Sequence, residues 1–162
     1  MKEIDIYTSN RAPSVGWLRP GCRGILIKDG KVLLSWAKTY DFYVFPGGGL
    51  EQNEGLADCC VREIAEETGY LTSLRPAGIQ VREYWESALL VFDYFTGDVT
   101  GTTERHLTEA EKDQNVLPVW MPVDEALQLF GAYESYFETD GGRAITYWRE
   151  YEALKAFLSE QN

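Results

Sequence analysis

The chain has 162 residues and a formal net charge of −11, with 44% hydrophobic and 25% charged residues. This length suits one domain with its own core, and the composition is that of a globular protein rather than a disordered one. The acidic excess argues against binding to DNA, RNA or an anionic membrane surface, because those partners need clustered Lys and Arg. It does not exclude a small molecule that carries phosphate, because a bound cation reverses the local charge.

Apolar runs and turn residues alternate along residues 1–162 without a linker or a repeat, which predicts a single mixed α/β (α+β) domain. The Asp29-Gly30 turn is the strongest hairpin signal, and Gly69 suits the left-handed position after a helix that Asn53 or Glu54 would cap. In chain order the predicted elements are a hairpin over 24–28 and 31–36, a strand over 43–45, a helix over 54–68, strands over 74–84 and 88–96, a polar loop with a helical turn over 101–115, an edge strand over 116–121, a helix from 122, and a final helix over about 144–159.

The N-terminus and the cysteines indicate a cytoplasmic location. The first residues lack a basic run followed by an apolar stretch, and no apolar run is long enough to span a membrane. Cys22, Cys59 and Cys60 form neither a disulfide framework nor a CxxC zinc motif. We therefore expect Cys59 and Cys60 to be small residues in a crowded helix.

The negative charge is concentrated in residues 48–70, where six acidic residues and one arginine account for −5 of the −11. On a helical wheel Glu63, Glu66 and Glu67 share an arc of about 100°. Like charges at these spacings repel by a few tenths of a kcal/mol, and carboxylates in the C-terminal half of a helix oppose its dipole. A divalent cation such as Mg²⁺ would remove this conflict, although the spacing alone is also compatible with a solvated acidic face.

A run of three glycines, Gly47-Gly48-Gly49, comes shortly before this acidic helix. Glycine allows a sharp turn and a close approach of the backbone to a ligand. A glycine turn that leads into a helix is a geometry that faces phosphate or metal in many proteins. The run is neither a Walker loop nor a GxGxxG motif, so by itself it is also explained by turn formation.

Taken together, these residues resemble the Nudix box, GX5EX7REUXEEXGU, in which U is a bulky aliphatic residue. The chain reads Gly48-x5-Glu54-x7-Arg62-Glu63-Ile64-x-Glu66-Glu67-x-Gly69-Tyr70, which matches eight of the nine specified positions. The departure is Tyr70, at a position where we expect packing rather than chemistry. Weaker similarity to Nudix domains extends over about residues 20–130.

The resemblance implies a Nudix-type α/β/α sandwich around a mixed β-sheet. It also implies a pyrophosphohydrolase that uses water and Mg²⁺ (or Mn²⁺) to cleave a diphosphate linkage in a nucleoside diphosphate derivative, such as a nucleoside triphosphate or a nucleotide sugar. By motif position, the metal ligands would be Gly47, through its carbonyl, Glu63, Glu66 and Glu67. The residues assigned to catalysis and its support would be Glu66, Glu67, Arg62 and Glu54.

Several features are left open at this level. The general base is either a box glutamate (Glu66 or Glu67) or a glutamate of the polar loop that holds Glu104, Glu109 and Glu111. Aromatic side chains are good platforms for a nucleobase, which makes Trp36, Tyr43 and Tyr84 candidate substrate-binding residues. The alternatives to a hydrolase are a non-catalytic nucleotide sensor and an enzyme of non-hydrolytic diphosphate chemistry. By resemblance, a homodimer is also expected.

Overall fold

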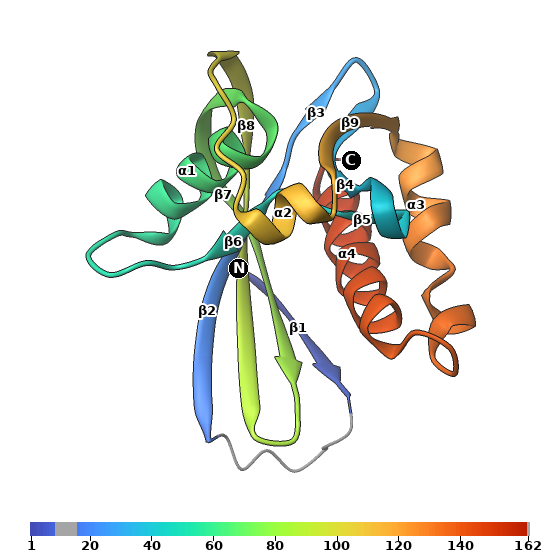
Figure 1. Cartoon of the computed structure of the whole chain (residues 1–162). Helices are drawn as coiled ribbons and strands as arrows, with labels where there is room; N and C mark the ends of the chain where they lie inside the picture. The colour runs from blue at the N-terminus through green and yellow to red at the C-terminus, as the bar shows by residue number, and fades with distance from the viewer. Residues whose placement is uncertain (9–15, 162) are drawn as a thin grey trace.

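The computed structural model describes residues 1–8 and 16–161, and it is built around a mixed five-stranded sheet (Figure 1). Its strand order is β1-β7-β8-β2-β6. The strands are β1 (Lys2–Tyr7), β7 (Tyr70–Tyr84), β8 (Ala88–Thr102), β2 (Trp17–Ile25) and β6 (Gly47–Gly49). β1 runs parallel to β7 and β2 parallel to β8, while the β7–β8 and β2–β6 pairs are antiparallel. The glycine run is thus an edge strand that β2 holds in place.

A smaller antiparallel sheet follows directly from β2. It consists of β3 (Ile27–Lys28), β4 (Lys31–Ala37), β5 (Phe42–Val44) and β9 (Val116–Pro122). β4 pairs with β3 and β5, and also with β9 along its whole length. β9 has no other strand partner among the described residues, which agrees with the edge position that its proline predicts.

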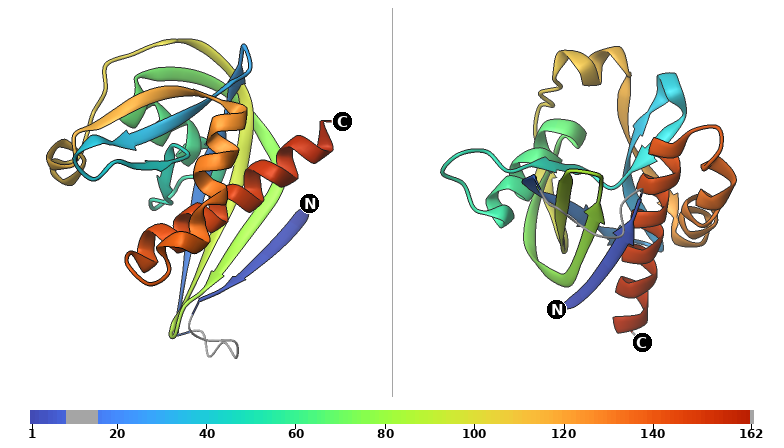
Figure 2. Two further views of the ribbon diagram at one scale, coloured as in Figure 1. Left: turned by 90° about the vertical axis from the view of Figure 1, so that its right-hand side faces the viewer. Right: turned by 90° about the horizontal axis from the view of Figure 1, so that it is seen from below.

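Helices cover both faces of the sheets, so the layers are those of an α/β/α sandwich (Figures 1 and 2). The helix of the glycine-rich motif, α1 (Leu56–Thr68), lies on one side, and α3 (Val123–Gly131) and α4 (Gly141–Glu160) lie on the other. The short α2 (Glu109–Asp113) and two 3₁₀ turns, Lys38–Tyr40 and Tyr133–Tyr136, complete the fold. No helix in the described part of the chain has the length and apolar character needed to cross a membrane.

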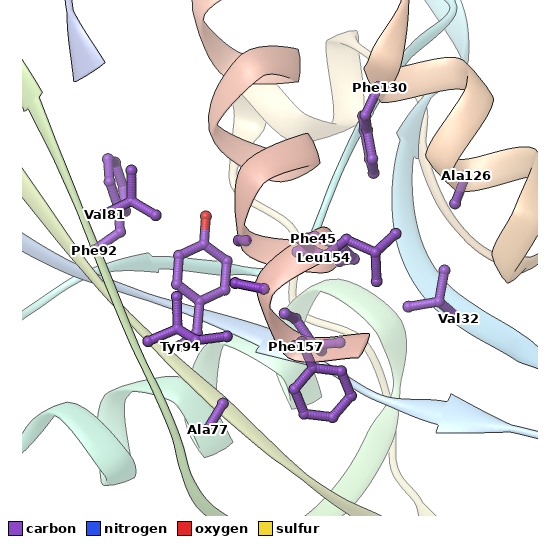
Figure 3. Packing of buried hydrophobic residues seen from close by; sticks show 14 of the residues in the cluster. Val32, Phe45, Ala77, Val81, Phe92, Tyr94, Ala126, Phe130, Leu154 and Phe157 are labelled. Carbon is purple, nitrogen blue, oxygen red and sulfur yellow. The ribbon is translucent and has the colours of Figure 1, made fainter. Parts of the chain in front are cut away.

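Two apolar clusters lie between the sheets and the helices, one on each side. The larger one joins the sheets to α3 and α4, and Phe45 lies at its centre against Tyr94 and Phe130 (Figure 3). The smaller one joins α1 to the sheets and contains all three cysteines, which are fully buried and unoxidised. Burial on both faces explains the continuous apolar run Val32-Leu33-Leu34 of β4, whereas β7 alternates buried and more exposed residues.

The predicted elements are present, with different boundaries. β7 and β8 are each 15 residues long and pair from Tyr70 to Thr102, so residues 101 and 102 belong to a strand rather than to the predicted loop. α1 begins at Leu56, and neither Asn53 nor Glu54 caps it. The reason is that the Glu54 carboxylate binds Arg62 and the backbone of Glu51 instead. Gly69 does take the left-handed conformation expected of it.

Candidate active site

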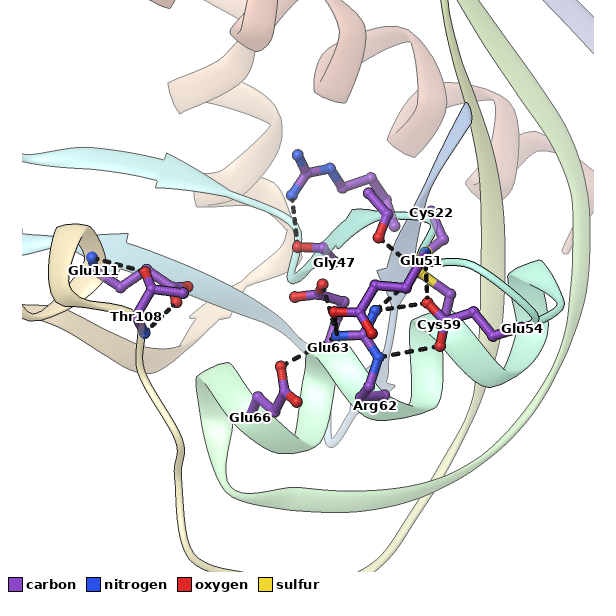
Figure 4. Close-up of polar contacts among 12 residues, drawn as sticks. Cys22, Gly47, Glu51, Glu54, Cys59, Arg62, Glu63, Glu66, Thr108 and Glu111 are labelled. Carbon is purple, nitrogen blue, oxygen red and sulfur yellow. Dashed lines mark hydrogen bonds and ion pairs between the residues drawn. The ribbon is translucent and has the colours of Figure 1, made fainter. Parts of the chain in front are cut away.

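Arg62, on the exposed side of α1, is the centre of a network of carboxylates (Figure 4). Its Nε and Nη2 donate to both oxygens of Glu54, at 3.1 and 2.7 Å. Its Nη1 donates to Glu63 at 3.0 Å and to Glu66 at 3.2 Å. One guanidinium therefore neutralises and orients two carboxylates of this helix and a third, Glu54, from the loop before it.

Glu54 connects the loop after the glycine run to α1. Besides the two bonds from Arg62, its carboxylate accepts a hydrogen bond from the backbone N–H of Glu51 at 2.9 Å. Hydrogen bonding to Arg62, followed by that to Glu51, lowers the pKa of Glu54 from 4.5 to about 2. Glu54 is therefore a permanent anion at neutral pH and a fixed partner for Arg62.

The glycine strand β6 passes so close to α1 and β2 that side chains are excluded. A Cβ at Gly48 would overlap the carboxylate of Glu63, and a Cβ at Gly47 would overlap the carbonyl oxygen of Cys22. Burial raises the pKa of Glu63, against the lowering effect of Arg62. The absence of side chains on β6 is thus what allows a partly buried carboxylate to lie directly against this backbone.

Glu67 differs from its neighbours because it is buried in the wall of a cavity. Its side chain is 8% exposed, and the hydroxyl of Ser35 on β4 donates a 2.7 Å hydrogen bond to it. Burial raises its pKa to about 8, although Arg23 and the bond from Ser35 oppose the rise. A carboxylate with a perturbed pKa in a cavity is a frequent property of functional sites.

The cavity beside Glu67 has a volume of about 200 Å³. Arg23 and Gly47 line it from the larger sheet, and Glu111 and Gln114 line it from α2 and the residue that follows. The other lining residues are Ser35, Ala37, Phe42, Val44 and Val116. Polar groups from both sheets and from two helices therefore converge on one space.

Arg23 connects the glycine strand to this cavity. Its Nη1 donates to the carbonyl oxygen of Phe45 at 3.0 Å and to that of Gly47 at 3.4 Å. Its Nε is buried and has no hydrogen-bond partner among the described residues. A partly buried guanidinium with a spare, buried donor is a natural partner for an anionic ligand.

The three glutamates of the polar loop are placed differently. Glu111 lines the cavity beside Glu67, whereas Glu104 and Glu109 do not. The position of Glu111 is set by a capping box at the start of α2, in which its carboxylate accepts from Thr108 N–H at 2.8 Å and its own N–H donates to Thr108 Oγ1. Of these three loop glutamates, Glu111 is therefore the one that lies at the cavity beside Glu67.

The donors around this site suit a hard divalent cation, because they are carboxylate and carbonyl oxygens. Among the described residues, however, no three acidic, Cys or His side chains are already gathered as a metal-binding group. Glu63 and Glu66 are instead paired with Arg62, and the buried Glu67 is hydrogen-bonded to Ser35. In this arrangement Arg62 provides the positive charge that the carboxylates require.

Comparison with known proteins decides the family. The NUDIX domain model matches residues 18–139. The chain belongs to the NUDIX family. No curated protein sequence matches it.

Solved structures agree with this NUDIX fold. A NUDIX hydrolase from Nitrosomonas europaea is 19% identical, with a TM-score of 0.58, over 85% of this chain and 90% of the other. The E. coli ORF135 protein is 25% identical, with a TM-score of 0.54, over 68% of this chain and 78% of the other. A MutT protein from Bacillus halodurans is 21% identical, with a TM-score of 0.54, over 68% and 72%. These likenesses confirm the predicted Nudix-type sandwich.

The aromatic residues predicted to bind substrate lie elsewhere in this NUDIX domain. Trp36 and Tyr43 stack on each other with ring centres 5.8 Å apart, and neither lines the cavity beside Glu67. Tyr84 stacks on Tyr7 at 4.9 Å. The reason is the alternation of side chains along a strand: β4 and β5 turn the neighbours of Trp36 and Tyr43 towards the cavity.

The cavity beside Glu67 is also lined by residues outside the motif that the sequence analysis did not single out. Arg23, Ser35, Phe42 and Gln114 come from β2, β4, β5 and the segment after α2, respectively. No spacing rule singles them out, because an isolated Arg or Ser in a strand is common. An alternation of small and large residues along 35–37 was the one available signal for a cavity-facing side of β4.

Proposed function

We propose that this chain is a Mg²⁺-dependent (or Mn²⁺-dependent) pyrophosphohydrolase, which cleaves the diphosphate linkage of a nucleoside diphosphate derivative. The observation that carries the proposal is the buried carboxylate of Glu67, with its raised pKa, in a cavity beside the glycine strand and Arg23. Family membership supports the same reaction class. A nucleotide sensor would need no buried acid of this kind.

Glu63, Glu66, Glu67 and the Gly47 carbonyl would hold the metal. When bound, a divalent cation polarises a phosphoryl group and lowers the pKa of water. Arg62 keeps Glu63 and Glu66 on the side of α1 where they serve this purpose. Arg23 lines the same cavity, and its positive charge would favour a bound phosphate group there.

For the proton transfer from the attacking water we propose Glu111 or Glu67 as general base. Glu111 lines the cavity across from α1 and close enough to Glu67 and Glu63 to raise the pKa of both. The capping box holds it at the start of a helix, so its orientation is defined before a ligand binds. The proposal does not include Glu104 and Glu109, because neither lines this cavity.

The test measures phosphate release from a panel of nucleoside diphosphate derivatives, coupled to a phosphatase, with Mg²⁺ or with EDTA. We expect turnover that requires the metal, and a loss of at least about a hundredfold in Glu67→Gln. Glu109→Gln is the matched control, since Glu109 is exposed and pairs only with Lys112. Absence of turnover on every substrate, or full activity of Glu67→Gln, would reject the proposal.

A further inference from the structure

A second cavity, of about 300 Å³, lies beside the C-terminal two residues of the glycine strand β6. Gly48 and Gly49 line it, whereas Gly47 lines the cavity of Glu67. Arg23 lines both cavities, so they are neighbours with a shared guanidinium. Gly142 and Thr146, from the first turns of α4, close another side.

This second cavity is positively charged in an acidic protein. Of the nine arginines in the chain, Arg19, Arg23 and Arg149 line it, and Glu83 is its only acidic lining residue. The described lining residues carry a net charge of +2, which the buried Glu150 beside Arg149 lowers to +1, although the chain as a whole carries −11. A basic cavity in an acidic protein concentrates anions.

Arg149 forms the rigid back wall of this cavity. It is 4% exposed, and it donates to Glu83 at 3.0 Å and to Glu150 at 2.7 Å. Its guanidinium also lies 4.2 Å from the ring centre of Phe92. Both of its carboxylate partners are buried, so its charge is already balanced, and a ligand must be recognised by the other two arginines.

Arg19 and Arg23 have the unused donors. Arg19 is exposed at the rim of the cavity and makes no hydrogen bond or ion pair with a described residue, and its Nη2 lies 3.4 Å from where a Cβ of Gly49 would be. Arg23 keeps its buried Nε without a partner. Two guanidiniums with free N–H groups thus border one small space beside the glycine strand, an arrangement that suits a phosphate or a carboxylate.

We propose that this cavity binds a second anionic group of the substrate, beyond the diphosphate that is cleaved, and that Arg19 is the residue that determines this specificity. The proposal rests on the proposed function, because it assumes that the diphosphate lies at Glu67. The volume matches the lower end of small-ligand sites and exceeds what a single water-filled gap needs. A neutral nucleobase against Trp85 would leave the buried Nε of Arg23 without a partner, which makes it the less favourable occupant.

The test compares substrates that differ in one charge. UDP-glucuronate and UDP-glucose differ by a carboxylate, and ATP and ADP differ by a phosphate. We expect kcat/KM to be about tenfold or more higher for the more anionic member of each pair, mainly through KM. Arg19→Gln should remove most of this preference and Arg19→Lys should retain part of it. Arg75→Gln is the control, because Arg75 is exposed on β7 and does not line the cavity.

Three outcomes would overturn the inference while leaving the proposed function intact. They are equal kcat/KM within both pairs, a preference for the less anionic members, and an equal loss on all substrates in Arg19→Gln. If the wild-type chain hydrolyses no substrate, the proposed function fails, and binding of UDP-glucuronate and UDP-glucose in EDTA then tests the cavity directly. Tighter binding of UDP-glucuronate that depends on Arg19 would support the inference, and its absence would overturn it.

Discussion

The hydroxyl of Ser35 donates a 2.7 Å hydrogen bond to the carboxylate of Glu67, and so connects the smaller sheet to the helix of the Nudix box. The two residues are 32 positions apart in the chain. Because Glu67 is buried, this bond is one of the few polar contacts that its carboxylate has. Its loss should therefore affect both the orientation of Glu67 and the stability of the cavity.

For Ser35→Ala we expect a decrease of about 1–3 kcal/mol in the free energy of unfolding, because a buried carboxylate oxygen loses its partner. We also expect kcat/KM to fall about tenfold or more, since the carboxylate is no longer held in place. Urea unfolding and steady-state kinetics measure the two effects. Ser35→Thr keeps the hydroxyl and serves as the control; equal losses in both variants would show that the hydrogen bond is not the cause.

The Arg62–Glu54 pair predicts a defined acid sensitivity. The pKa of Glu54 is lowered from 4.5 to about 2, so the ionised form stabilises the folded state. This contribution is complete above about pH 4.5 and is lost as the pH falls towards 2. Glu54→Gln should therefore be less stable than wild type at pH 7, and the difference should shrink between pH 4.5 and 2.

Thermal unfolding at a series of pH values measures this effect. Glu51→Gln is the matched control, because Glu51 is 69% exposed and its nearest oxygen lies 3.6 Å from Arg62. Such an exposed pair contributes little to stability. A stability difference between wild type and Glu54→Gln that stays constant down to pH 2 would contradict the prediction.

Gly48→Ala should disrupt the site without unfolding the domain. The added Cβ would overlap the carboxylate of Glu63, which must then move away from the glycine strand. A displacement of about 1 Å in such a site costs on the order of a hundredfold in rate, so we expect a loss of this size in kcat/KM. Gly141→Ala is the control, since a Cβ there meets nothing within 4 Å. Wild-type kinetics in Gly48→Ala would refute the proposed role of this close contact.

Glu150 connects the final helix, α4, to the residues just before the glycine strand. Its carboxylate accepts from the Phe45 N–H at 2.7 Å, from the Tyr94 hydroxyl at 2.8 Å and from Arg149 Nε at 2.7 Å. Glu150→Ala leaves a buried guanidinium and a buried N–H without this partner, so we expect a loss of about 3–5 kcal/mol in the free energy of unfolding.

Urea denaturation tests this value, with Glu152→Ala as the comparison. Glu152 is on the same helix but pairs with Lys155 at the surface, where a loss of about 0–1 kcal/mol is expected. If the two variants are equally stable, the buried network does not contribute as we infer.

Local pattern was sufficient for the elements whose signals are contained in a few consecutive residues. The Asp29-Gly30 turn predicted the β3–β4 hairpin, and Gly69 predicted the end of α1. Helix boundaries were less predictable: Asn53 and Glu54 look like caps, but Glu54 binds Arg62, eight residues later, and leaves Gly55 at the start. Whether such a side chain caps a helix or binds another residue is known only when the positions of both possible partners are known.

The sequence by itself determined the match to the Nudix box and the helix on which three carboxylates share one side, because these depend on spacing within a single segment. The sandwich fold was what that resemblance implied. Only the tertiary structure decided which residues face the site. Strand register turns Ser35 towards Glu67 and Trp36 away from it, and packing brings Arg23 and Glu111 to one cavity and Arg19 and Arg149 to another. The physical reason is that such contacts join residues distant in the chain, and their energies appear only after the sheets and helices have packed.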